Sequence, residues 1–359
     1  MDRSTALTLS WLNVLTKKRY DALLQAFGDL SHAREKISED LLFSLGCRTD
    51  TILKTINRLE EFDPDMYERE LSKRSLQFLT IEDDLYPSRL REIADPPVFL
   101  YSRGDLEILN QPGIALVGTR EMSDYGKRVA EDFAAAFVQA GLITVSGLAL
   151  GIDACVARET LRASGKTVAS LGHGLGQIYP RENSHLADEI VACGGLLLTE
   201  FPLDTMPDKY TFPARNRIIA GLSLGTVVLE APLGSGALIT ADLALDYGRD
   251  VFAVPGQIYD PNYAGCHRII AQGTAKLITA PSDVLVELGI VAAEKRTNSF
   301  QAASPEEEAI FHVLTPLPQP VEDLVRKSSL SAGTVNGTLT ILELQGAAKR
   351  VGNGMWVKT

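Results

Sequence analysis

The chain has 359 residues, of which 45% are hydrophobic and 23% are charged, the balance of an ordinary globular protein rather than a disordered one. Its formal net charge of −11 excludes a surface coated with basic residues, although a local positive patch would still allow binding to nucleic acid. No apolar run approaches the ~18 residues that span a bilayer, and the first segment lacks the pattern of a signal peptide, so we expect a cytoplasmic protein with no membrane partner.

The cysteines and histidines are too dispersed to predict a disulfide framework or a metal site. The four cysteines form no C-x-x-C pair and are Cys47, Cys155, Cys193 and Cys266. This pattern is typical of reduced, mostly buried thiols in a cytosolic protein. We therefore expect no bound metal.

Residues 1–66 predict a small helical domain. Two segments, 21–30 and 38–46, have helical patterns that close on Gly28 and Gly46, and glycine is a common residue just after a helix. Few strand patterns occur in this part of the chain.

Residues 67–290 predict a doubly wound α/β domain. Short strands are expected at 76–81 and 97–104, followed by a regular alternation of apolar strands with amphipathic helices such as 123–141. The expected strands of that alternation are 114–119, 142–147, 167–172, 196–200, 226–231, 251–256 and 276–280. Apolar strands separated by helices predict a parallel sheet with helices on both faces.

The last part of the chain predicts a linker at 291–304, which is polar and aperiodic, and a winged-helix domain at 305–359. Ser304 is the expected N-cap of its first helix, with Pro305 at the first helical position. The expected helices are 305–314, 321–327 and 331–344, followed by a hairpin around a Gly-Asn-Gly turn.

Glycine, arginine and small polar residues gather where the predicted parallel strands end, and these ends share one edge of a sheet. Glycine lets an anion approach the backbone, and helix N-termini and arginine donate hydrogen bonds to it. We predict phosphate contacts from Arg120, Arg215 and Arg217, with hydrogen bonds from Asn183 and Asn216. The other predicted phosphate-binding positions, mainly a backbone cradle, are Gly118, Thr119, Ser146, Gly147, Ser235 and Gly236.

Motifs for nucleotide cofactors and for catalysis are incomplete. The segment GHGLGQ (172–177) lacks the third glycine of a dinucleotide fingerprint, and Ser146 stands where a ribose-binding acid is expected. The segment GKT (165–167) lacks the partner glycine of a P-loop and precedes a strand. We therefore expect no cofactor and, without a Ser/His/Asp or Cys/His arrangement, no catalytic residues.

These strand ends resemble those of the DNA-processing protein A family, known as DprA or Smf. The resemblance is carried, in order over residues 75–290, by ALVGTR, SGLALGID, GLGQIYPREN, LLLTEFP, FPARNRIIAGLS, VVLEAPLGSGALITADLAL, DVFAVPG and GCHRIIAQGTAKLI. It implies an extended Rossmann-like domain, preceded by a small helical (SAM-like) domain and followed by a winged helix.

The resemblance also implies a function. DprA-like proteins act as homodimers that bind and protect incoming single-stranded DNA and load the RecA recombinase onto it during natural transformation, without known catalysis. The positive pocket of the family corresponds to Arg120 and to 215–217 here, and we expect Lys209 to add charge and Phe212, with Tyr210, to add a stacking surface. Phosphate contacts combined with stacking predict binding that depends on salt but not on base sequence.

The expected recognition helix of the winged-helix domain, within 330–346, has no lysine or arginine. Helices that read a DNA groove normally carry such residues, so we expect this domain to serve packing or a protein partner. Lys349, Arg350 and Lys358 in the hairpin are its candidate phosphate contacts.

Two alternatives use the same pocket. One is a phosphoribohydrolase-like enzyme of the lysine-decarboxylase-like type, but its catalytic glutamate is replaced by Ile239 or a neighbour, which leaves Glu200 and Glu230 as acid–base candidates. The other is a sensor of a small nucleotide, which would gain little affinity from a longer strand.

Overall fold

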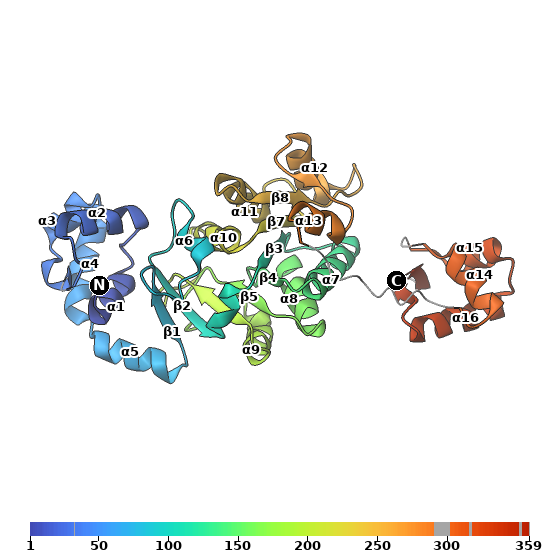
Figure 1. The fold of residues 1–359 in the computed structure, drawn as a ribbon, viewed down its shortest axis with the longest axis horizontal. Helices are drawn as coiled ribbons and strands as arrows, with labels where there is room; N and C mark the ends of the chain where they lie inside the picture. The colour runs from blue at the N-terminus through green and yellow to red at the C-terminus, as the bar shows by residue number, and fades with distance from the viewer. Residues whose placement is uncertain (32, 291–301, 316–317, 352–353, 359) are drawn as a thin grey trace. The chain divides into compact units, whose positions relative to one another are not determined.

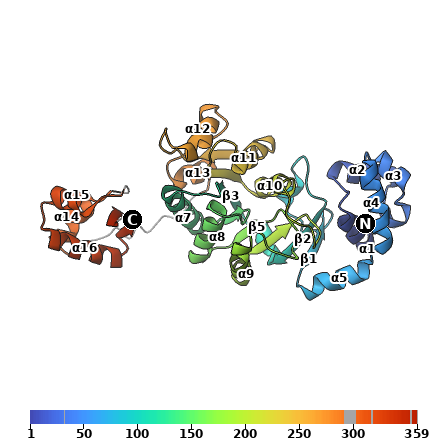
Figure 2. The same cartoon turned by 180° about the vertical axis from the view of Figure 1, so that it is seen from behind.

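The computed structural model describes residues 1–31, 33–290, 302–315, 318–351 and 354–358. The chain forms two compact units, Met1–Ala293 and Glu294–Thr359 (Figure 1; Figure 2 shows the view from behind). Most of the predicted linker, 291–304, lies outside the described residues. Among the helices that are described, none is both long and apolar enough to cross a membrane.

The first part of the larger unit is helical, as predicted. Its helices are α1 (Arg3–Leu12), α2 (Lys17–Phe27), α3 (Glu39–Ser44), α4 (Thr49–Glu61) and α5 (Pro64–Lys73), with a 3-10 turn at Ala33–Lys36. Helix α2 ends at Gly28, whose φ of 70° is readily adopted only by glycine. Gly46, just after α3, also has a positive φ, of 72°.

These helices share their hydrophobic core with the sheet that follows. The Ser10 and Tyr101 hydroxyls lie 2.7 Å apart and are buried, and the Tyr67 hydroxyl accepts a hydrogen bond of 3.0 Å from the Leu203 N–H. The change from helices to strands after α5 is therefore a change of secondary structure within one packed unit.

One nine-stranded sheet forms the centre of this unit. Its strands are β1 (Gln77–Thr80), β2 (Phe99–Gly104), β3 (Gly113–Gly118), β4 (Ile143–Ser146), β5 (Thr167–Ser170), β6 (Leu196–Thr199), β7 (Gly225–Glu230), β8 (Asp250–Ala253) and β9 (Lys276–Leu277). They are ordered β1-β2-β6-β5-β4-β3-β7-β8-β9, and all neighbours are parallel except β1–β2 and β2–β6. Strands β1 and β2 lie in the two segments where short strands were predicted, and they extend one edge of the mostly parallel sheet by antiparallel pairing.

The order of the strands creates a switch point between β3 and β7. From β3 the chain builds the sheet in one direction through β4, β5 and β6, and then returns to the other side of β3 to add β7, β8 and β9. The loops after β3 and β7 therefore diverge, and ligands of open α/β sheets bind in the crevice between such loops.

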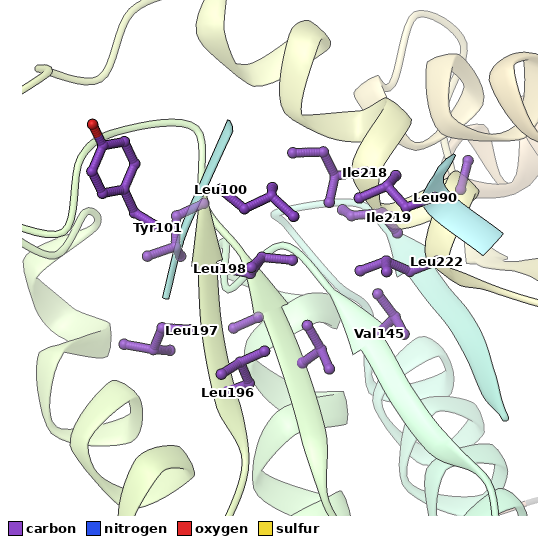
Figure 3. Close-up of a cluster of buried hydrophobic side chains, with 14 of the residues drawn as sticks. Leu90, Leu100, Tyr101, Val145, Leu196, Leu197, Leu198, Ile218, Ile219 and Leu222 are labelled. Carbon is purple, nitrogen blue, oxygen red and sulfur yellow. The ribbon is translucent and has the colours of Figure 1, made fainter. Parts of the chain in front are cut away.

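Helices cover both faces of the sheet, because alternate residues of each buried strand point to opposite faces. On β3, Ile114 and Leu116 belong to the core under α7 and α8, whereas Ala115 and Val117 belong to the core that includes α10 and α11. Figure 3 shows Ile218, Ile219 and Leu222 of α10 in this second core with residues of the strands. The helices and 3-10 turns are α6 (Ser88–Arg91), η2 (Leu106–Asn110), α7 (Asp124–Gln139), α8 (Ile152–Arg162), η3 (Arg181–Asn183), α9 (Ser184–Ala192), α10 (Thr211–Leu222), α11 (Gly236–Asp246), η4 (Pro261–Tyr263), α12 (Ala264–Ala271) and α13 (Pro281–Glu287).

The smaller unit has the predicted arrangement of three helices and a terminal hairpin. Its elements are α14 (Pro305–Val313), α15 (Val321–Ser328), α16 (Ala332–Leu344), β10 (Ala348–Val351) and β11 (Met355–Lys358). Ser304 caps α14 as predicted, since its hydroxyl accepts a 3.2 Å hydrogen bond from the Glu307 N–H. On α16, which has no lysine or arginine, Ile341 and Leu344 are exposed, so the helix presents apolar side chains to solvent.

Candidate nucleic-acid site

A cavity of about 810 Å³ lies at the switch point between β3 and β7. Its walls come from the loops after these two strands and from the segment that leads into α10. The predicted site residues that line it are Gly118, Thr119, Arg120, Lys209, Phe212, Arg215, Asn216, Ser235 and Gly236. The structure therefore brings together residues separated by more than 100 positions in the sequence, as the parallel-sheet argument requires.

Arg217 does not line this cavity, so the structure does not place it with the other residues predicted to contact phosphate. Its guanidinium forms an ion pair with Glu200 and donates a hydrogen bond to the carbonyl of Asp95. Burial raises the pKa of Glu200, whereas Arg217 lowers it. Arg217 is thus the partner of a buried carboxylate and joins α10 to the segment before β2.

Three other predicted residues also lie outside the cavity lining, and each has a structural task. The Ser146 hydroxyl donates to the Leu116 carbonyl at 2.9 Å, inside the sheet. The Asn183 amide donates to the carbonyl of Leu148 at 2.9 Å. Leu148 is buried and has a φ of 56°, which is uncommon for a residue other than glycine. The Gly147 N–H donates to the Asp153 carboxylate at 3.1 Å.

Arg120 and Lys209 are the exposed cations of the cavity. Within the described part of the chain, neither forms an ion pair with a carboxylate. The Arg120 guanidinium lies 5.3 Å from the centre of the Phe212 ring, and the Lys209 ammonium lies 4.9 Å from that of Tyr210. Cations held over aromatic faces remain free to donate to an anion, so both are available for phosphate.

A pair of aromatic rings forms one wall of the cavity. The rings of Tyr179 and Phe212 are 6.0 Å apart between centroids, and 45% of Tyr179 is exposed. Tyr179 is held in place by the buried His173, whose Nε2 accepts a 3.2 Å hydrogen bond from the Tyr179 N–H. Burial lowers the pKa of His173, which keeps the ring neutral and able to accept this hydrogen bond. Tyr179 was not among the predicted site residues, although it lies within the GLGQIYPREN motif.

The N-terminus of α11 opens onto the same cavity. Ser235 is its N-cap, since the hydroxyl accepts a 3.3 Å hydrogen bond from the Ala237 N–H. The Asn216 amide donates to the Gly236 carbonyl at 3.2 Å, which fixes the first turn of α11 against α10. The positive end of the helix dipole favours an anion here, as the sequence predicted for this strand end.

The inner part of the cavity lining contains a buried arginine and a buried carboxylate. Arg215 is only 5% exposed and donates to the Ser170 carbonyl at 2.5 Å, while its Nε has no hydrogen-bond partner. Asp153 is 7% exposed and accepts from the N–H groups of Gly147 and Ala149 at 3.1 and 3.4 Å. Burial lowers the pKa of Arg215 to about 10 and raises the pKa of Asp153, and the charge of each residue opposes the shift of the other.

The two glutamates left as acid–base candidates do not line the cavity. Glu200 is paired with Arg217, and the Glu230 carboxylate accepts hydrogen bonds from the N–H and hydroxyl of Ser123 at 3.1 Å, at the start of α7. Burial raises the pKa of Glu230. In the residues that the structure describes, no cluster of His, Cys, Asp or Glu could hold a metal ion.

Comparison with known proteins agrees with this fold. A family model described as DNA recombination-mediator protein A matches residues 77–289, and a model of the DprA winged helix domain matches residues 294–354. The DNA processing protein DprA of Streptococcus pneumoniae is 41% identical over 258 residues, which cover 70% of this chain and 89% of that protein. The chain belongs to the DprA family.

Other DprA relatives match over different shares of their length. The DprA protein of Bacillus subtilis is 41% identical over 65% of this chain and 78% of its own length. Protein Smf of Synechocystis is 42% identical over 67% of this chain, but the match spans only 61% of that relative. The chain thus spans about three fifths of the length of this relative.

Two solved DprA structures resemble this one. The structure of DprA from S. pneumoniae has a TM-score of 0.67 at 37% identity and covers 80% of this chain and 98% of that one. The second is a structure of DNA processing protein A from Helicobacter pylori, described for its single-stranded DNA binding mode. It has a TM-score of 0.53 at 32% identity, and the match covers 59% of this chain and 95% of that one.

Gly118 and Gly236 both line the cavity, but a side chain is tolerated only at one of them. A Cβ at Gly118 would lie 2.5 Å from Ile152 and 2.9 Å from the Glu230 carbonyl oxygen, whereas a Cβ at Gly236 has nothing within 4 Å. We predict that Gly118→Ala lowers the free energy of unfolding by about 1–3 kcal/mol and that Gly236→Ala does not. Urea denaturation of both variants tests this, and equal stability would contradict the packing role of Gly118.

Proposed function

We propose that this cavity binds the backbone and bases of single-stranded DNA, without catalysing a reaction on it. The observation that carries the proposal is the pairing of two exposed cations, Arg120 and Lys209, with the aromatic wall of Tyr179 and Phe212 in one cavity. Cations meet phosphates, and aromatic rings stack on bases of any identity, which is how proteins hold single strands without reading their sequence.

A strand suits the cavity better than a duplex, because the bases of a duplex are stacked on each other and cannot reach an aromatic wall. The cations and the rings come from separate turns of the sheet edge, after β3, after β5 and before α10. Several nucleotides of a flexible strand would be needed to reach all of them. The single-stranded DNA named for the H. pylori protein is consistent with this proposal.

Membership of the DprA family supports the wider role that we propose for the chain in the cytoplasm. In this role it protects incoming single-stranded DNA during natural transformation and loads RecA onto the strand. We also propose that it acts as a homodimer through its Rossmann-like unit. Strand β9 is a terminal strand of the sheet, and Leu277 on it is 48% exposed, so this edge offers apolar surface to a second copy. RecA filament assembly on DNA coated with the protein tests the loading of RecA. Light scattering of the purified protein tests whether it is a homodimer.

Removal of either exposed cation should reduce the salt dependence of DNA binding. We predict that Arg120→Ala and Lys209→Ala each weaken binding of an oligothymidylate and lower the slope of log affinity against log salt by about 0.7, the value for one lost phosphate contact on a single strand. Arg162→Ala is the matched control, since Arg162 is exposed at the far end of α8. A slope that is unchanged in both variants would contradict the proposed contacts.

Phe212 should contribute by stacking rather than by bulk alone. We predict that Phe212→Ala costs about 1–3 kcal/mol of single-strand binding, that Phe212→Tyr keeps most of the affinity and that Phe212→Leu does not. Fluorescence anisotropy with a labelled oligonucleotide measures the three affinities, and thermal melting checks the fold because Phe212 is half-buried. Equal affinity of the Leu and Tyr variants would argue against stacking.

A further inference from the structure

Asp153 is an unexpected residue in a cavity proposed to bind phosphate, because a carboxylate repels an anion. It lines the cavity and is 7% exposed, so solvent screens its charge poorly. The other acidic residues of the lining, Glu121 and Asp208, are exposed. A buried carboxylate at such a position needs a physical reason.

The reason lies in the geometry of Arg215, the buried cation of the same lining. A Cβ added to Gly147 would lie only 2.0 Å from a terminal nitrogen of the Arg215 guanidinium, so the guanidinium rests directly against this glycine. The N–H of the same glycine donates to Asp153. Gly147 thus contacts both residues, and the charge of each opposes the pKa shift that burial causes in the other.

Arg215 has few other partners. Its one described hydrogen bond goes to the Ser170 carbonyl, and its Nε, although buried, has no acceptor. A buried cation with unused donors is costly unless an anion is near it. Asp153 is the anion that acts on this cation within the protein, and in the DNA complex a phosphate would be a second one.

We propose that Asp153 limits the affinity of this cavity for single-stranded DNA by neutralising Arg215, so that a DNA phosphate must compete with a resident carboxylate for this cation. The inference rests on the proposed function and assigns a role within it. Arg120 and Lys209 then supply the net positive charge of the cavity, while Arg215 is a cation whose charge is already compensated. A protein that passes its strand on to a recombinase benefits from such a limit, because release must remain fast.

This role predicts opposite effects on stability and on binding when the carboxylate is neutralised. Asp153→Asn keeps an oxygen that can accept from the Gly147 N–H but removes the negative charge. The unliganded protein then holds an unpaired buried cation and should melt at a lower temperature. The same cation should bind phosphate more strongly, by about three- to tenfold in single-strand affinity. A carboxylate that only supports the fold would lower both quantities.

The experiment measures the melting temperature and the affinity for labelled oligothymidylate in wild type, Asp153→Asn, Arg215→Gln and the double variant. The gain in affinity should appear in the wild-type background and largely disappear in the Arg215→Gln background. Asp208→Asn is the control for a general change of charge, because Asp208 is exposed. Its effect on the affinity for oligothymidylate should vanish at high salt, whereas the effect of Asp153→Asn on that affinity should persist because Asp153 is buried. If Asp153→Asn does not fold, Asp153→Ser replaces it, with a hydroxyl as the acceptor.

Weaker binding of a folded Asp153→Asn variant would overturn the inference, as would a gain of equal size in both backgrounds. These outcomes are distinct from a failure of the proposed function, which would appear as absence of oligothymidylate binding by the wild-type protein.

Discussion

The cavity depends on the way β3 and β7 end side by side. The Thr119 N–H donates to the Glu230 carbonyl at 2.7 Å, and the Thr119 carbonyl in turn accepts from the Ile152 N–H at the start of α8. These hydrogen bonds hold three strand–helix junctions in contact while the loops beyond them diverge. Gly118 and Gly151 are needed at this junction, because a Cβ at either would meet a backbone oxygen within 3 Å.

Around this junction, burial divides the arginines into two kinds. Arg217 forms an ion pair with Glu200, and Arg215 packs against Gly147 and interacts with the charge of Asp153. Both arginines therefore already have acidic partners within the protein. Arg120 is exposed beside Phe212. A chain with a net charge of −11 can therefore carry a local site for an anion, because a few unpaired cations at a helix N-terminus decide the local potential.

The sheet, both flanking helical regions and the edge that carries the cavity could be predicted from the sequence, because apolar strands and glycine turns are local patterns. The pairing of side chains could not. Arg217 meets Asp95 and Glu200, 122 and 17 positions away, and no local pattern distinguishes it from Arg120. The buried Asp153 and the exposed Tyr179 were missed for the same reason, since burial and orientation are set by tertiary packing. The pattern of strand ends predicted only a site for an anion. The identification of that anion as DNA came from the family resemblance, because neither composition nor residue spacing indicates it.

The central claim is that the cavity holds a strand rather than a mononucleotide or a duplex. The most direct measurement is fluorescence anisotropy of the full-length protein with labelled single strands of increasing length, with a duplex of the same sequence and with an unlabelled mononucleotide competitor, at two salt concentrations. The account predicts affinity that rises with strand length, falls with salt and exceeds that for the duplex. Binding that is independent of length and fully displaced by a mononucleotide at comparable concentration would contradict it.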